Sequence, residues 1–136
     1  MTASARTAIL RANAIYLLVA AAGGFATDLL GVFFARGAFA PVVANAPYAG
    51  IGSVEAHGLA FIIGVLLWRA ETTRLWHLTA VAVHILLGTA NLVFWQIFVA
   101  TDMLAAGYVT TSLHWIFVAL QLAAAHAAGT GETRRA

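Results

Sequence analysis

The chain of 136 residues has no cysteine and no lysine, and only 9% of its residues are charged. The lack of cysteine excludes disulfides, thiolate metal sites and cysteine nucleophiles. A net charge of +2 is too small for a nucleic-acid-binding surface, so we expect no nucleic-acid partner. The chain is 62% hydrophobic, with a mean hydropathy of +0.91. This composition predicts an integral membrane protein whose main partner is the lipid bilayer.

Four apolar runs are long enough to cross a bilayer as helices, because a spanning helix needs about 20 mostly apolar residues. We expect these spans at about residues 13–35, 51–68, 76–100 and 105–128. They use most of the chain, so residues 1–136 are expected to form a single membrane domain. The short connections favour an all-α, up-down-up-down bundle of four transmembrane helices.

The connector between the first two spans contains Pro41 and Pro47, which are typical of a loop, and its apolar residues favour a place at the membrane interface. Ser53 followed by Glu55 is typical of a helix start, with Ser53 as the N-cap residue. We therefore expect the second helix to begin close to Ser53.

The arginines are distributed unequally between the two ends of the predicted bundle. Six fall on one side, and Arg36 alone falls on the other. The six are Arg6, Arg11, Arg69, Arg74, Arg134 and Arg135. By the positive-inside rule, both termini are expected to be cytoplasmic. We expect the protein to reside in the bacterial cytoplasmic (inner) membrane.

Three ionisable residues on three different spans fall at one depth. Asp28, His57 and His114 lie about 9–14 Å inside the outer boundary, at about 1.5 Å per helical residue. Such residues cost at least ~2.5 kcal/mol each to insert, so their coincidence favours a functional role. We therefore predict a polar site in the outer half of the bundle, built from these residues. Its expected wall consists of Asn91, Trp95 and Gln96.

Glu55 and His57 are two residues apart, so on a helix their side chains diverge by about 200° and only one can face the bundle. We expect His57 to face inward and Glu55 to reach the headgroup region. His84 and Asn91 have two readings of equal weight, an interhelical hydrogen bond and a functional role. Gln121 is expected to contribute to packing between helices.

Several chemistries fit the predicted site. His57 and His114 can ligate a b-type haem across the bundle, with Asn91 and Trp95 around the cofactor. Asp28 with both histidines is also a suitable ligand set for a divalent metal ion such as zinc or iron. Binding of such a cofactor, metal, proton or small ligand is the leading prediction.

Three alternatives remain beside it. The same carboxylate and imidazoles can couple proton movement to transport of a small solute, for which a homodimer is expected. Asp28, His57 and His114 can also act as catalytic acid and base on an apolar, lipid-like substrate. Motifs for hydrolytic nucleophiles, phosphate loops and dinucleotide binding are absent from the sequence. The last alternative is an accessory subunit of a larger membrane complex.

Overall fold

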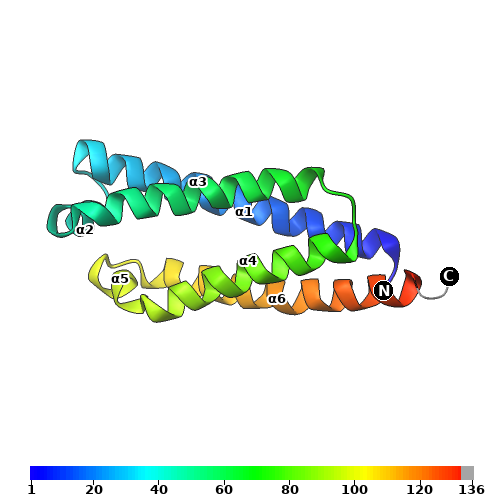
Figure 1. Cartoon of the computed structure of the whole chain (residues 1–136). Coiled ribbons are helices and arrows are strands. Elements are labelled where there is room, and N and C mark those ends of the chain that lie inside the picture. The colour runs from blue at the N-terminus through cyan, green and yellow to red at the C-terminus, as the bar shows by residue number, and fades with distance from the viewer. Residues whose placement is uncertain (133–136) are drawn as a thin grey trace.

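A computed structural model describes residues 1–132 of the chain, and within this range every regular element is a helix. The four long helices are α1 (Ala3–Phe34), α3 (Pro47–Arg69), α4 (Arg74–Val93) and α6 (Leu104–Glu132), and the two short ones are α2 (Ala40–Asn45) and α5 (Trp95–Ala100) (Figure 1). Each long helix is long and apolar enough to cross a membrane. The prediction of an all-α chain with four helices of spanning length is thus confirmed. Arg134 and Arg135 lie outside the described residues.

Two helices begin earlier than the hydrophobic runs suggest. α1 begins at Ala3, where the Thr2 side chain accepts a hydrogen bond of 3.2 Å from the Ala5 N–H and so satisfies one free donor of the first turn. α3 begins at Pro47, because proline fits the first helical turn, where its missing N–H is not needed. The prediction that Ser53 caps this helix is therefore wrong. Ser53 lies inside α3, and its side chain is free to bond elsewhere.

The third run forms two helices instead of one. α4 ends at Val93, Phe94 leaves helical geometry with φ −100° and ψ 27°, and α5 follows. The connector after α1 also differs from the expected loop, because its middle folds into α2. Both short helices therefore lie at one end of the molecule (Figure 1).

The long helices form two closely packed pairs. α1 packs most extensively against α3, and α4 against α6, whereas α1 meets α6 over a much smaller region. Figure 1 shows the N-terminus, the α3–α4 connection and the end of α6 at one end of the molecule, with α2 and α5 at the other. The buried apolar core lies toward the first end, and its members are Leu10, Ala14, Leu17, Leu67, Ala70 and Ala80. The two pairs are thus joined mainly in one half of the bundle.

Arginine side chains reinforce that half. Arg11 donates hydrogen bonds of 2.7 and 3.0 Å to the carbonyl oxygens of Leu67 and Ala70. Both carbonyls lie at the C-terminal end of α3, where carbonyl oxygens lack donors inside the helix. A cation near these carbonyls is stabilising. Arg6 similarly donates to the Ala127 carbonyl of α6 at 3.2 Å. Both contacts attach the start of α1 to the ends of its neighbours.

Gly64 sets the distance between α1 and α3. A Cβ at this position would lie 3.0 Å from Leu18 Cγ and 3.2 Å from the Leu18 backbone nitrogen. We expect Gly64→Ala to lower the free energy of unfolding by about 1–3 kcal/mol, because the helices must separate. The measurement is thermal unfolding in mild detergent. Gly52→Ala is the matched control on the same helix, since a Cβ there meets nothing within 4 Å. An equal loss of stability in Gly64→Ala and Gly52→Ala would contradict the close approach of α1 and α3 at Gly64.

Candidate functional site

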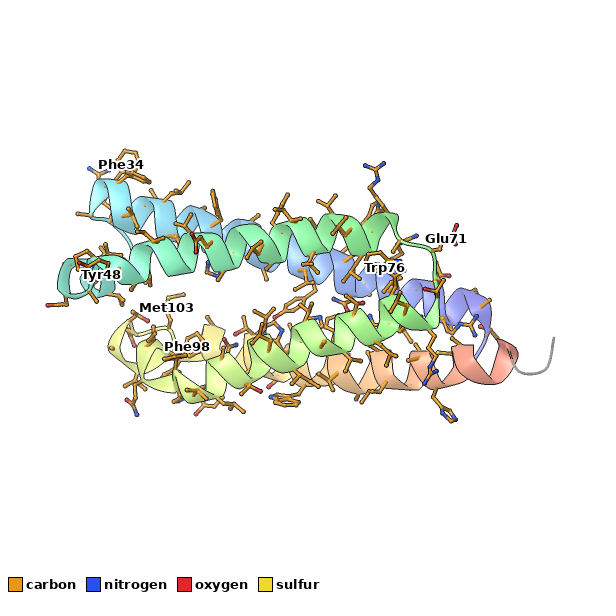
Figure 2. All side chains as sticks on the ribbon, in the orientation of Figure 1. Phe34, Tyr48, Glu71, Trp76, Phe98 and Met103 are labelled. Atoms are coloured by element: carbon orange, nitrogen blue, oxygen red, sulfur yellow. The ribbon has the colours of Figure 1, made fainter. Side chains whose placement is uncertain are left out.

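A cavity of about 880 Å³ lies between the two helix pairs. Its lining is mostly apolar and comes from all four long helices and from the α2 and α5 regions. Phe98 and Met103, labelled in Figure 2 at the α5 end, belong to this lining. The side chains with polar groups that line it are Tyr16, Thr27, Asp28, Ser53, His57, Asn91, Thr101, Thr110 and His114. The cavity is therefore an apolar space with a few polar groups on its walls.

Asp28 and His57 form a direct pair on one wall. Asp28 is 2% exposed, and its Oδ2 lies 2.6 Å from His57 Nδ1. Its other oxygen accepts a hydrogen bond of 2.7 Å from the Ser53 hydroxyl. Ser53 and His57 are four residues apart on α3, so both project from one helix face toward α1. Both oxygens of the Asp28 carboxylate thus have a partner from α3.

Gly24 provides the space in which the His57 ring lies. It precedes Asp28 by one helical turn, and a Cβ at Gly24 would lie 2.3 Å from His57 Nε2. His57 Nδ1 donates to Asp28, whereas Nε2 has no hydrogen-bond partner among residues 1–132. The His57 side chain is 38% exposed and lines the cavity. Its Nε2 is therefore the polar atom that this wall offers to a ligand.

His114 lines the same cavity from α6 but does not belong to the Asp28–His57 pair. Its Nδ1 lies 2.8 Å from His84 Nδ1, and its ring contacts the edge of Tyr16. Within the described part of the chain, no group of three His, Asp or Glu side chains is placed to hold a metal ion. The structure therefore brings the three predicted residues to one cavity, but it does not assemble them as a three-ligand metal set.

The predicted wall residues have different positions. Asn91 lines the cavity and donates a hydrogen bond of 3.1 Å to the Thr110 hydroxyl. Trp95 instead packs against Phe98 and Tyr108, because the break at Phe94 turns α5 away from the line of α4. Gln96 is exposed. Of the three expected wall residues, Asn91 is the one that contributes to the cavity.

Glu55, His84 and Asn91 are the other polar residues for which a position or a contact was predicted. Glu55 is exposed while His57 packs against Asp28, so His57 is the one of the two that faces the bundle, as expected. His84 forms hydrogen bonds with Asn13 of α1 and His114 of α6, and Asn91 bonds to Thr110 of α6. The interhelical hydrogen bonds expected of these two residues are thus confirmed.

Sequence reasoning missed a buried polar network in the other half of the bundle. His77 Nδ1 bonds to Gln121 Oε1. The Gln121 amide donates to Asn13 Oδ1 at 2.7 Å, and the Asn13 amide donates to His84 Nε2 at 2.7 Å. His77, Gln121, Asn13 and His84 are all fully buried. The available signal was that Asn13 shares a helix face with Leu10, Ala14 and Leu17, all of which are buried.

Removing the Asp28 carboxylate is expected to destabilise the protein. Asp28→Ala leaves His57 Nδ1 and the Ser53 hydroxyl without their acceptor, at a loss of about 3 kcal/mol. Ser53→Ala removes one donor and keeps the His57 contact, so we expect a loss of about 1 kcal/mol. Both are measured by thermal unfolding in detergent, followed by circular dichroism. An Asp28→Ala variant as stable as the unchanged protein would contradict the described hydrogen bonds.

The chain was compared with protein families, curated proteins and solved structures, and no match was found in any of the three. A fold by itself does not identify an activity, since four-helix bundles serve many functions. The cavity and its polar residues are therefore the features of this protein that bear on its function.

Proposed function

We propose that this protein binds a mostly apolar small molecule from the bilayer in the cavity between its helix pairs, with His57 as the group that recognises it. The observation that carries this proposal is the Asp28–His57 pair on the wall of a cavity of about 880 Å³. Small-molecule sites typically occupy about 300–1,000 Å³ and combine apolar walls with a few placed polar groups. The size and the lining of this cavity match that description.

The pair with Asp28 determines how His57 acts. A carboxylate only accepts hydrogen bonds, so His57 uses its Nδ1–H for Asp28 and keeps a lone pair on Nε2 when it is neutral. An imidazole oriented in this way can accept a hydrogen bond from a ligand hydroxyl or take up its proton. The adjacent carboxylate would stabilise the imidazolium that forms. The pair therefore suits recognition of a hydroxyl group and acid–base chemistry on it.

Within the membrane, we place the four helices in up-down-up-down order with both termini in the cytoplasm. Arg6, Arg11, Arg69 and Arg74 support this orientation, since they belong to the end of the bundle that holds the N-terminus, whereas Arg36 belongs to the other end (Figure 1). The proposed location is the bacterial cytoplasmic membrane. The cavity then opens in the outer half of the bilayer, where an apolar ligand can enter from lipid.

Co-purification tests the proposed binding with two adjacent glycines. Gly24→Ala places a Cβ where His57 Nε2 lies, whereas a Cβ at Gly23 meets nothing within 4 Å. Apolar molecules that copurify in mild detergent are extracted and quantified by mass spectrometry. We expect one class to be enriched with the unchanged protein and with Gly23→Ala, and to fall about tenfold in Gly24→Ala, the effect of losing about 1.4 kcal/mol of binding free energy. Identical extracts from all three proteins would contradict the proposal.

Cysteine labelling tests the orientation, because the natural chain contains no cysteine. Single cysteines are introduced at Ser4, in the first turn of α1, and at Ala38, in the α1–α2 connection. In intact bacterial cells, a membrane-impermeant maleimide is expected to label position 38 and to label position 4 only after lysis. The reverse pattern would contradict cytoplasmic termini.

A further inference from the structure

The buried network on the cytoplasmic side of the cavity has a defined hydrogen-bond direction. The Asn13 amide nitrogen only donates, so His84 Nε2, 2.7 Å away, must accept and carries no proton. A neutral His84 then carries its proton on Nδ1 and donates it to His114 Nδ1 at 2.8 Å. A doubly protonated His84 would direct an N–H at the Asn13 amide hydrogens. The Asn13 contact therefore holds His84 in one neutral tautomer.

The same reasoning extends to the cavity wall. Because His114 Nδ1 accepts from His84, a neutral His114 carries its proton on Nε2. His114 lines the cavity, so its polar contribution there is an N–H donor. His57 contributes the opposite, because its Nδ1–H is used by Asp28 and its Nε2 is an acceptor. Two imidazoles on different helices thus have opposite hydrogen-bonding roles in one cavity.

We propose that this arrangement selects neutral, mostly apolar molecules that carry a hydroxyl donor for His57 and an oxygen acceptor for His114. The inference rests on the proposed function and adds to it the chemical class of the ligand. Asn13 and His84 are positioning residues, since they act on the ligand only through the tautomer of His114. Molecules that lack the hydroxyl leave His57 Nε2 without a donor and bind less tightly.

The network positions His114 and is poorly suited to conduct protons. Its links at Gln121 and Asn13 are carboxamides, which do not exchange their protons as imidazoles and carboxylates do. His77, at the far end, has a buried Nε2 that lacks a hydrogen-bond partner within the described residues. The carboxamide links and the unpartnered His77 Nε2 fit a network that fixes the direction of each hydrogen bond up to His114.

Nuclear magnetic resonance of ring nitrogens tests the tautomers directly. Protein labelled with ¹⁵N-histidine is studied in detergent micelles, where protonated and unprotonated ring nitrogens give separate signals. We expect a proton on Nδ1 of His84 and on Nε2 of His114. A proton on Nδ1 of His114, or a doubly protonated His84, would overturn the inference. A haem absorption band that depends on His114 would overturn it too, because an axial ligand binds iron through an unprotonated nitrogen.

A pair of asparagine variants tests whether the network sets the tautomer. Asn13→Ala removes the donor to His84 Nε2, so His84 and His114 are expected to populate both tautomers. Asn91→Ala is the matched control, because Asn91 bonds to Thr110 and not to His84. We expect unchanged tautomers in this control. A fixed His114 tautomer in folded Asn13→Ala would overturn the positioning role, and the measurement on the unchanged protein remains decisive if that variant does not fold.

Two probes that differ by one methyl group test the ligand class. Heptyl 4-hydroxybenzoate offers a hydroxyl and a carbonyl, and heptyl 4-methoxybenzoate lacks the donor. Binding is measured in nanodiscs, with empty nanodiscs subtracted. We expect the hydroxyl probe to bind about tenfold more tightly, and this preference to disappear in His57→Ala.

Failure of the inferred ligand class and failure of the proposed binding give different results. Equal binding of both probes to the unchanged protein would overturn the inference and the role of His57 in recognising a hydroxyl. The binding of an apolar molecule in the cavity would still stand. Binding of neither probe would overturn the inference, and the proposed function would then be decided by the copurifying molecules of the Gly23 and Gly24 variants.

Discussion

A carboxylate inside an apolar bundle must find hydrogen-bond donors, and this requirement organises one half of the molecule. Asp28 is 2% exposed and takes donors for both oxygens from α3. Water in a bilayer core is too scarce to replace those partners. The contact therefore fixes how far α1 and α3 are displaced along each other and how each is rotated. Gly24 and Gly64 complete the arrangement, because only residues without side chains allow such proximity.

The other half of the bundle satisfies its polar groups by a different route. Asn13, His84 and Gln121 are fully buried and bond to one another across α1, α4 and α6. These hydrogen bonds connect the two helix pairs, which otherwise meet over a small region. The connection lies mainly in the arginine-rich half, and the hydrogen bond from the Tyr16 hydroxyl to the Thr110 carbonyl extends it to the cavity wall. Beyond that contact, the pairs leave space between them. The cavity is thus a consequence of where the polar contacts between the pairs lie.

The sequence allowed the membrane class and the four long helices to be predicted, because apolar runs depend on composition alone. It also identified Asp28 and His57 through their depth, which follows from counting residues along a helix. The hydrogen-bond partner of each polar group could not be predicted from the sequence, because it depends on helix rotation and on which helices are neighbours. For that reason an interhelical hydrogen bond was expected of His84, but Asn13 was not identified as its partner. The break at Phe94 was missed because neither proline nor glycine marks it.

Pairing within α1–α3 and within α4–α6 also bears on how the protein assembles. Most helix packing joins long helices that follow one another in the chain, and such contacts form readily because little chain entropy is lost in closing short loops. Helices that insert separately into a bilayer associate afterwards through packing and hydrogen bonds. The α1–α3 and α4–α6 hairpins would form early, and their association through Asn13 and its partners would be the last step. The cavity between the pairs would then exist only in the fully assembled protein, and neither hairpin alone would contain it.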